Sequence, residues 1–375
     1  PLLYYAAKKN KCKSGVMITG SHNPKNYNGI KLIINDKPVS GNEIYKLLDR
    51  NKDKSEVPGK IKFFDIKSNY VEEVKNNIQI DENFRLKVVI DCGNGAAGCI
   101  APKLFSELGC EVIELFTEVD GNFPNHHPDP GKLENLQDLI AKVKLTKADL
   151  GLAFDGDGDR VGLITDKGDV IYPDKILMMF CKEILNKNKG SIIFDVKCTN
   201  ALPDLIKNLG GTPIMSPTGH FHIKNGIKKH NPLLAGEMSG HIFFNDKWHG
   251  FDDGHYSGAR IIELISNNKR SISAINNDLP NLFSTPELNI TVTDETKFQI
   301  IEDFSMKCNL KGEKINIDGL RINFKNGWGL LRASNTTPKL VMRFEGNTED
   351  DLKEIQNNFL HELSRICPNI DINLD

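Results

Sequence analysis

Two stretches of the chain repeat the order strand, helix, strand, and this order constrains the fold more than any other feature of the sequence. In the first stretch, strand-like runs at 86–91 and 110–116 flank a helical segment. In the second, runs at 191–196 and 212–216 flank a helical segment over 200–208. Two strands joined by a helix lie parallel in one sheet, because the helix crosses back over the face of that sheet. The chain is therefore expected to build α/β units.

The length and the composition narrow the class of protein. A chain of 375 residues is too long for one ordinary domain and is expected to form two to four. Its formal net charge of -2 does not suit a dedicated nucleic-acid binder. No run approaches the roughly 18 apolar residues that span a membrane, and the first residues lack the basic start of a signal peptide. The eight cysteines are scattered without a C-x-x-C pair, which argues against zinc and favours free thiols in a reducing compartment. We therefore expect a cytoplasmic protein with no nucleic-acid or membrane partner.

Changes in composition divide the chain into four expected domains. Residues 51–69 are rich in Lys, Asp and Ser and contain a Pro-Gly pair, which is typical of a linker. The first three domains are expected to be similar mixed α/β units, and the last a smaller α+β domain. We place the boundaries at 1–67, 68–168, 169–282 and 283–375.

The first of these domains is expected to be incomplete. Residues 15–19 have the pattern of a short buried strand and 30–34 that of a second strand, with a polar loop between them. A doubly wound domain usually has a strand and a helix or two ahead of such a loop, whereas this chain reaches it soon after Pro1. We therefore expect that the front of the domain is missing.

A run of alternating aspartates predicts a metal site. The strand-like run 148–154 ends in the sequence Asp-Gly-Asp-Gly-Asp-Arg, residues 155–160. Three carboxylates separated by glycines can surround one hard cation, and oxygen ligands suit Mg²⁺. An EF-hand calcium loop is excluded, because its sixth position would be Arg160 instead of Gly and its twelfth Asp166 instead of Glu. An acidic surface turn is the alternative, but like charges this close repel one another without a cation. The expected ligands are Asp155, Asp157 and Asp159.

The polar loop of the first domain carries a candidate nucleophile. Residues 19–24 read Thr-Gly-Ser-His-Asn-Pro. The Ser21 hydroxyl beside the His22 imidazole suits a nucleophile or phosphoryl carrier with a neighbouring hydrogen-bond donor. Lys31, on the following strand, suits a general acid/base if its pKa is lowered. On these residues alone, a polar turn without chemistry explains the segment equally well.

Two later loops have the chemistry of phosphate and sugar recognition. Residues 332–338 read Arg-Ala-Ser-Asn-Thr-Thr-Pro, and a guanidinium with hydroxyl and backbone donors can grip a phosphate. Residues 236–241 read Gly-Glu-Met-Ser-Gly-His, in which Glu237 and Ser239 at alternate positions can bond adjacent sugar hydroxyls. A capped polar turn and a solvated surface loop are the respective alternatives.

Other patterns carry less information. Gly93-x-Gly95-x-x-Gly98 matches the dinucleotide fingerprint, with Glu114 near the place of a ribose-binding acid, but a plain turn between strand and helix is preferred. His126-His127 is assigned to a loop turn in preference to a metal pair. Three residues at strand ends are as readily structural as functional on local grounds; they are Lys197, His220 and Arg160.

The order of the four loops is more specific than any one of them. The Ser-His-Asn-Pro, Asp-Gly-Asp-Gly-Asp-Arg, Gly-Glu-Met-Ser-Gly-His and Arg-Ala-Ser-Asn-Thr-Thr-Pro loops, in this order, closely resemble the α-D-phosphohexomutase superfamily in its bacterial phosphomannomutase/phosphoglucomutase branch. The resemblance covers essentially all 375 residues and implies four domains around a central cleft, with one loop from each. Phosphoglucosamine mutases match less closely, because their phosphate loop typically reads Arg-x-Ser-Gly-Thr-Glu-Pro and their sugar loop has Gln where Met238 stands.

The resemblance also implies a role for each loop. Ser21 would carry the phosphoryl group, and a phosphoryl oxygen would complete the site at which the three aspartates hold one Mg²⁺ per chain. Lys31 and His22 resemble the acid/base group and its neighbour, with Arg160 near the phosphate. The residues implied in substrate binding are Lys197, His220, Glu237, Ser239, His241, Arg332, Ser334, Asn335, Thr336 and Arg343.

The activity implied by the resemblance is a mutase reaction. Such an enzyme interconverts hexose 1-phosphate and hexose 6-phosphate, of mannose or glucose, through a phosphoserine and a hexose 1,6-bisphosphate. Its partners would be hexose phosphates, and the chain would be a monomer or weak oligomer. The alternatives are an inactive fragment that retains at most sugar-phosphate binding, a phosphoglucosamine mutase and, more distantly, an oxidoreductase that uses the turn at 93–98.

Overall fold

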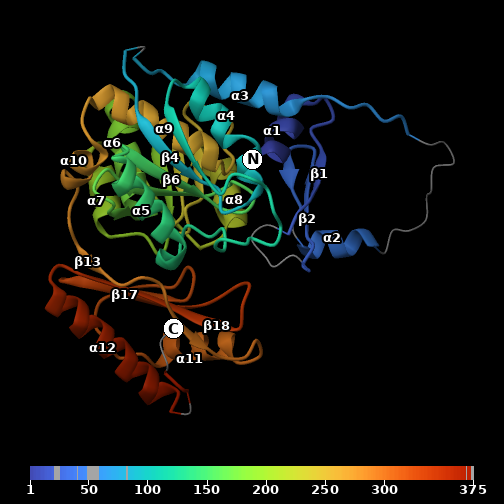
Figure 1. The fold of residues 1–375 in the computed structure, drawn as a ribbon. Coiled ribbons are helices and arrows are strands. Elements are labelled where there is room, and N and C mark those ends of the chain that lie inside the picture. Colours follow the sequence, from blue (N-terminus) through green and yellow to red (C-terminus); the bar gives the residue numbers. More distant parts are fainter. Residues whose placement is uncertain (21–25, 40, 49–58, 82, 369, 373–375) are drawn as a thin grey trace.

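A computed structural model describes most of the chain and shows four sheets, each packed with helices (Figure 1). The described residues are 1–20, 26–39, 41–48, 59–81, 83–368 and 370–372. The predicted class, α/β units followed by a different C-terminal unit, is confirmed. Within the described residues no helix is both long and apolar enough to cross a membrane.

The first unit is a small antiparallel sheet packed on one helix. Its strands pair in the order β1-β2-β3. Leu3 and Ala7 of the helix bury Ile33 on one face of the sheet, while Val16 and Ile18 on the other face are 59% and 65% exposed. The prediction that β1 is a buried strand is therefore wrong, because β1 lies at a sheet edge and among the described residues only one of its faces is covered. The elements are α1 (Leu2–Lys9), β1 (Gly15–Ile18), β2 (Ile30–Ile34), β3 (Lys37–Pro38) and α2 (Gly41–Leu48).

The second and third units share one plan. In each, three parallel strands are followed by an antiparallel strand, in the orders β5-β4-β6-β7-β8 and β10-β9-β11-β12. The loop that follows the last parallel strand, β6 in one and β11 in the other, turns directly into the antiparallel strand. The strands of the second unit are β4 (Lys87–Asp91), β5 (Glu111–Leu115), β6 (Leu150–Phe154), β7 (Val161–Thr165) and β8 (Val170–Ile171). Those of the third are β9 (Ser191–Asp195), β10 (Thr212–Ser216), β11 (Leu234–Gly236) and β12 (Ile242–Phe244).

Helices join these units into one body. The largest hydrophobic cluster includes Tyr5 of the first unit, Leu152 of the second and Phe180 and Ile192 of the third. Helix α9 (Gly254–Asn268) is buried from Gly254 to Ser266 and packs against strands of both central sheets. The other helices are α3 (Ile66–Asn77), α4 (Ala101–Glu107), α5 (Gln137–Thr146), α6 (Pro173–Lys187), α7 (Ala201–Asn208), α8 (His220–His230) and α10 (Ile272–Asn277), with short 3₁₀ turns at Ala96–Cys99 and Leu133–Leu136.

The fourth unit has its own core and a different topology. Its antiparallel strands run in the order β13-β18-β17-β16-β15, with β14 also paired to β18, and two helices pack on the sheet. It meets the third unit through Trp328, which packs on Val196, and through Arg321, which donates to the carbonyl of Cys198 at 2.9 Å. Its elements are β13 (Phe283–Ser284), β14 (Leu288–Thr291), α11 (Lys297–Lys307), β15 (Glu313–Ile315), β16 (Leu320–Phe324), β17 (Gly327–Ala333), β18 (Lys339–Gly346) and α12 (Glu349–Ile366).

Candidate active site

The aspartate loop joins β6 to β7 and gathers three carboxylates. Asp155, Asp157 and Asp159 each offer an oxygen, and these oxygens lie within 4.8 Å of one another. Gly158 has a φ of +72°, and a Cβ there would lie 2.5 Å from the ring of His255, so the tight loop requires glycine. Oxygen ligands converging in this way fit a small hard cation such as Mg²⁺.

Basic side chains from two units neutralise this loop. Lys31 of β2 places its Nζ 2.6 Å from Asp157 Oδ2 and 3.0 Å from Asp159 Oδ2. Arg160 donates from Nε to Asp155 at 2.9 Å and from Nη1 to Asp129 at 3.0 Å. The structure thus brings the predicted Lys31 and Arg160 to the predicted metal ligands, although they come from different parts of the chain.

Burial and charge shift the pKa values of these groups. Burial, with the neighbouring Asp159, raises the pKa of Asp155 to about 7. Burial lowers the pKa of Lys31, but the carboxylates of Asp159 and Asp157 outweigh it, so that this pKa is raised. The predicted acid/base role of Lys31 required a lowered pKa. Its pKa is raised instead, because the ammonium is paired with the carboxylates of Asp157 and Asp159.

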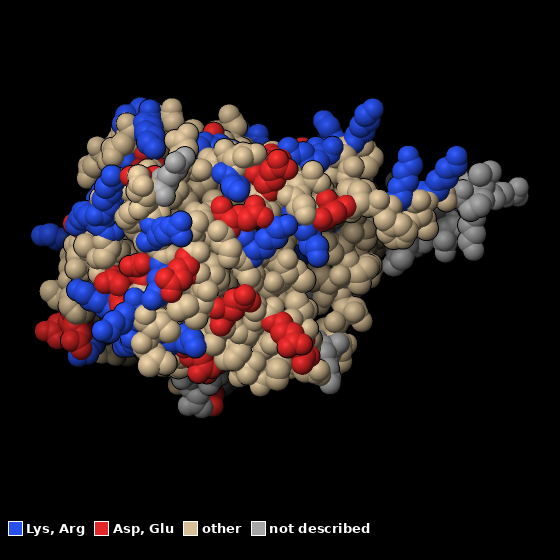
Figure 2. Space-filling view, turned by 45° about the horizontal axis from the view of Figure 1, so that its top comes forward, with Lys and Arg blue, Asp and Glu red and all other residues tan. Residues whose placement is uncertain are grey.

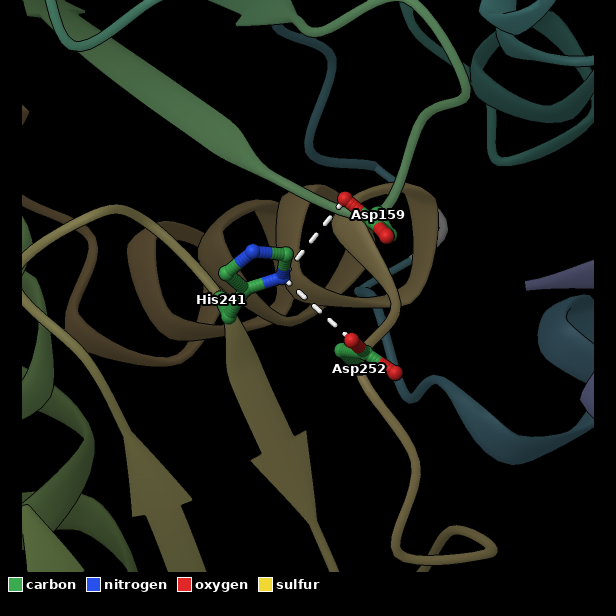
Figure 3. Close-up of side chains that lie close together, drawn as sticks. All are labelled: Asp159, His241 and Asp252. Carbon is green, nitrogen blue, oxygen red and sulfur yellow. Dashed lines mark ion pairs between the residues drawn. The ribbon is translucent and has the colours of Figure 1, made fainter. Parts of the chain in front are cut away.

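A histidine connects the aspartate loop to the sugar loop (Figure 3). His241 Nδ1 lies 3.5 Å from Asp159 Oδ1 and 3.3 Å from Asp252 Oδ2, with the ring between the two carboxylates. Burial lowers the pKa of His241, but Asp159 and Asp252 raise it to about 9. The predicted His220 lies on the same carboxylate, with its Nδ1 3.6 Å from Asp252 Oδ2. The two carboxylates thus favour the protonated form of His241, which links the sugar loop to the aspartate loop.

The sugar loop is tied to the aspartate loop through its backbone. Residues 160 and 241 form an isolated antiparallel bridge, and the N–H of Val161 donates to the carbonyl of Gly240 at 3.4 Å. Glu237 is buried, and its Oε1 accepts from the N–H of Gly219 at 2.6 Å. Its Oε2 has no hydrogen-bond partner among the described residues, which leaves an acceptor for a ligand hydroxyl. Ser239 is half-buried on the same loop.

Lys197 and Arg343 lie where the third and fourth units meet. Lys197 is buried and pairs with Glu287, and Asp195 lies 3.9 Å from its Nζ. Arg343 donates to Asp174 at 3.1 Å and to the carbonyl of Lys197. Both residues were predicted to bind substrate, and in the structure Arg343 supports the backbone of Lys197.

The arginine loop of the fourth unit is held from the third. Arg332 donates from Nε to Asp318 at 2.9 Å, and the same carboxylate accepts from the N–H of Thr218 at 2.9 Å. Its Nη2 is buried without a hydrogen-bond partner among the described residues. Ser334 shapes the loop, because its Oγ accepts from the hydroxyl of Thr337 at 2.8 Å. The predicted Asn335 and Thr336 are exposed at the tip.

The predicted nucleophile and its neighbour belong to the segment that joins β1 to β2. Ser21 and His22 lie outside the described residues. The strands on either side of them, β1 and β2, form an antiparallel pair, with Ile18 opposite Ile30 and Met17 opposite Lys31. Because Lys31 touches the aspartate loop, the hairpin that carries the serine loop is in contact with that loop.

The glycine-rich turn at 93–98 and the pair His126-His127 make contacts that support neighbouring parts of the second unit. The N–H of Ala96 donates to the carbonyl of Gly156 at 2.8 Å, and a Cβ at Gly95 would lie 2.9 Å from Gly156, so the turn supports the aspartate loop. His126 Nε2 lies 3.0 Å from Asp91, which fits the preferred loop-turn interpretation. On the face shown in Figure 2, acidic and basic side chains are interspersed, as expected from the near-neutral net charge.

Several residues of the site were missed by sequence reasoning. Asp129 holds Arg160, Asp318 holds Arg332, and Asp252 joins two histidines. Lys224 pairs with Asp252 at 2.8 Å. The sequence held one signal for Lys224. It lies four residues after His220, so the two side chains share a face of α8 and can reach the same carboxylate.

Comparisons with known proteins agree with this arrangement. Models of the four domains of phosphoglucomutase/phosphomannomutase match residues 1–56 (domain I), 68–168 (domain II), 172–283 (domain III) and 287–362 (C-terminal domain). A phosphomannomutase/phosphoglucomutase from Pseudomonas syringae is 54% identical over 99% of this chain and 80% of its own length. A phosphoglucomutase from Neisseria gonorrhoeae is 48% identical over 96% of this chain and 79% of its own length.

A solved structure shows the same arrangement of units. It is a phosphoglucomutase/phosphomannomutase family protein from Burkholderia thailandensis, 43% identical in sequence. The match covers 100% of this chain and 82% of that one, with a TM-score of 0.92.

Proposed function

The chain belongs to the phosphoglucomutase/phosphomannomutase family, and from this premise we propose that it interconverts hexose 1-phosphates and hexose 6-phosphates of glucose and mannose. The observation that carries the proposal is the contact of Lys31 with Asp157 and Asp159, at 2.6 and 3.0 Å. It joins the hairpin of the candidate phosphoserine to the candidate metal loop. The relatives from Pseudomonas syringae and Neisseria gonorrhoeae are named for mutases of mannose and glucose phosphates, which supports activity on both sugars.

The proposed reaction is a phosphoryl transfer through Ser21. A sugar hydroxyl attacks the phosphorus of phosphorylated Ser21, the bond from phosphorus to Ser21 Oγ breaks, and the hydroxyl proton ends on Oγ. The product is a hexose 1,6-bisphosphate, which turns end for end in the cleft. The other phosphate then returns to Ser21 by the reverse step, which leaves the isomer.

The described residues have distinct parts in this scheme. Asp155, Asp157 and Asp159 would hold one Mg²⁺, which when bound offsets their attraction for Lys31 and neutralises charge on phosphoryl oxygens. Lys31 would carry the hydroxyl proton to Oγ, and Arg160 would face the transferred phosphate.

Recognition is assigned to the third and fourth units. Glu237 offers its unpartnered Oε2 to a sugar hydroxyl, and Arg332 offers its unpartnered Nη2 to the phosphate that is not transferred. Because the bisphosphate turns in the cleft, Arg332 has to accept a phosphate on either end of the sugar. All of these residues come from one chain, which supports function as a monomer or weak oligomer.

Replacement of Ser21 tests the proposal. Ser21→Ala should abolish turnover of glucose 1-phosphate and the incorporation of labelled phosphate from glucose 1,6-bisphosphate, because the acceptor oxygen is gone. Ser14→Ala, which removes a hydroxyl that accepts from the N–H of Asn35 at 3.1 Å near the same hairpin, is the matched control and should stay active. Normal turnover of Ser21→Ala would overturn the scheme. Binding of glucose 1-phosphate without turnover by the unaltered chain would favour a sugar-phosphate binder instead.

A further inference from the structure

We propose that Lys224 is a positioning residue for the mutase reaction, which fixes Asp252 and through it the orientation of His241. The inference rests on the proposed function. Lys224 itself touches none of the three carboxylates of the metal loop in the described structure.

Lys224 is buried where the third unit meets α1 of the first. It stands on α8, its side chain is only 8% exposed, and its Nζ lies 2.8 Å from Asp252 Oδ1. A buried ammonium is retained when its charge is paired, because desolvation otherwise costs too much. The lysine is therefore tied to one carboxylate oxygen.

The other oxygen of Asp252 faces the two histidines of the site. Asp252 Oδ2 lies 3.3 Å from His241 Nδ1 and 3.6 Å from His220 Nδ1, and the residue has no exposed surface. The ion pair of Oδ1 with Lys224 opposes rotation of the carboxylate, which favours the orientation that points Oδ2 toward His241 (Figure 3). His241 is in turn held between Asp252 and Asp159.

The first unit completes the surroundings of Lys224. The ring centroid of Tyr4, on α1, lies 3.8 Å from Lys224 Nζ, which is a cation–π contact. The same ring stacks on Phe251, the residue before Asp252, with centroids 5.6 Å apart. Tyr4 of α1 therefore contacts both Lys224 and the segment that carries Asp252, which links the first unit to the surroundings of His241.

Removal of the charge tests the role. Lys224→Met keeps most of the side-chain volume, and we expect kcat for glucose 1-phosphate to fall about 10–100-fold with KM changed by less than about 3-fold. Lys224→Arg should recover most of kcat. Lys247→Met is the matched control, because Lys247 also pairs with a buried carboxylate, Glu263, at 3.4 Å, and lies outside the proposed machinery. It should leave kcat unchanged, and an equal loss of kcat in both Met variants would overturn the proposal.

A double-mutant cycle separates positioning from loss of stability. Asp252→Asn alone should lower kcat, and adding Lys224→Met should lower it by less than about 2-fold more, because Lys224 acts through Asp252. The double variant lacks both the lysine and the aspartate charge, so it leaves no unpaired ammonium in the protein interior. It can therefore be measured even if Asp252→Asn alone fails to fold. A full further loss in the Asn background would overturn the proposal.

A readout independent of turnover distinguishes failure of this proposal from failure of the proposed function. The ring resonances of His241, followed by NMR in the intact chain, should shift in Lys224→Met and stay in place in Lys247→Met. Unshifted resonances in Lys224→Met would reject the positioning role even if the unaltered chain proved inactive as a mutase. Tyr4→Leu should shift the same resonances less than Lys224→Met, and Tyr4→Phe, which keeps the ring, should leave them in place.

Discussion

The aspartate loop and the arginine loop each contain a buried arginine that is paired with a carboxylate, but the two pairs are held differently. Arg160 is paired with Asp155 and Asp129 inside the second unit, and its loop is buried in the shared core. Arg332 is paired with Asp318 of the fourth unit, which is tied to Thr218 of the third, and the tip of its loop is exposed. The region proposed for the chemistry is thus fixed within one unit, whereas the loop proposed to bind the phosphate depends on how two units meet.

The largest effect should follow from a change in the aspartate loop. Asp157→Asn removes one anionic ligand, and we expect kcat/KM for glucose 1-phosphate to fall about 10³-fold at saturating Mg²⁺. Titration of activity with Mg²⁺ should show that half-maximal activity needs a higher Mg²⁺ concentration, because the site has lost an anionic ligand. The control is Asp166→Asn, at a carboxylate in the β7–β8 turn that accepts from the N–H of Ser273 at 3.1 Å. An unaltered Mg²⁺ dependence in Asp157→Asn would contradict the assignment of the aspartate loop as the metal site.

Stability should separate the two loops as well. Gly158→Ala adds a Cβ 2.5 Å from His255 at a φ of +72°, and we expect it to lower the free energy of unfolding by roughly 2–4 kcal/mol. Gly121→Ala, whose Cβ would meet nothing within 4 Å, is the matched control. Urea denaturation of both variants measures the difference. Equal stabilities would show that the aspartate loop is less constrained than its packing indicates.

A substitution in the arginine loop should act on binding more than on turnover. Arg332→Lys loses the two-pronged donor, and KM for glucose 1-phosphate should rise roughly 10–100-fold while kcat changes much less. Steady-state kinetics of the two variants, Arg332→Lys and Arg160→Lys, make the comparison direct, because the latter should lower kcat. A fall in kcat alone for Arg332→Lys would contradict the division of labour.

The smallest effect is expected at the link between the units. Asp318→Asn keeps an acceptor for Arg332 and Thr218 but removes its charge, and KM should rise roughly 2–10-fold. Asp303→Asn, at a surface ion pair with Lys307, is the control. No change in KM would mean that the charge of Asp318 is not needed to position Arg332.

The sequence predicted the parts of the site that have a local pattern. Asp155, Glu237 and Arg332 each lie at or just after the end of a strand. The apolar run of each strand and the polar loop that follows it are visible in the sequence. Asp129, Asp318 and Asp252 are single carboxylates whose partners are distant in the sequence, so no local pattern marks them. The pairing of Lys31 with two of the aspartates is likewise set by tertiary contact, which explains why its pKa direction was not foreseen.

The fold was predicted to a similar extent. Strands β2, β6 and β10 and helix α7 begin and end close to their expected residues, because their apolar periodicity is strong. The exposure of Val16 and Ile18 was not predicted, since three apolar side chains in a row cannot indicate which face of a strand is covered. Helix α8, which carries Lys224, was also not foreseen, and its charged residues obscure the apolar face.

The backbone bridge between residues 160 and 241 sets a shared limit on length variation. An extra residue in either hairpin, after β6 or after β11, would push the partner hairpin out of register and move cation ligands and sugar acceptor together. The tip at residues 335–338 has no comparable tether to another unit among the described hydrogen bonds, so lengthening it would disturb its own end of the cleft alone. Insertions are therefore expected to be tolerated best at that tip.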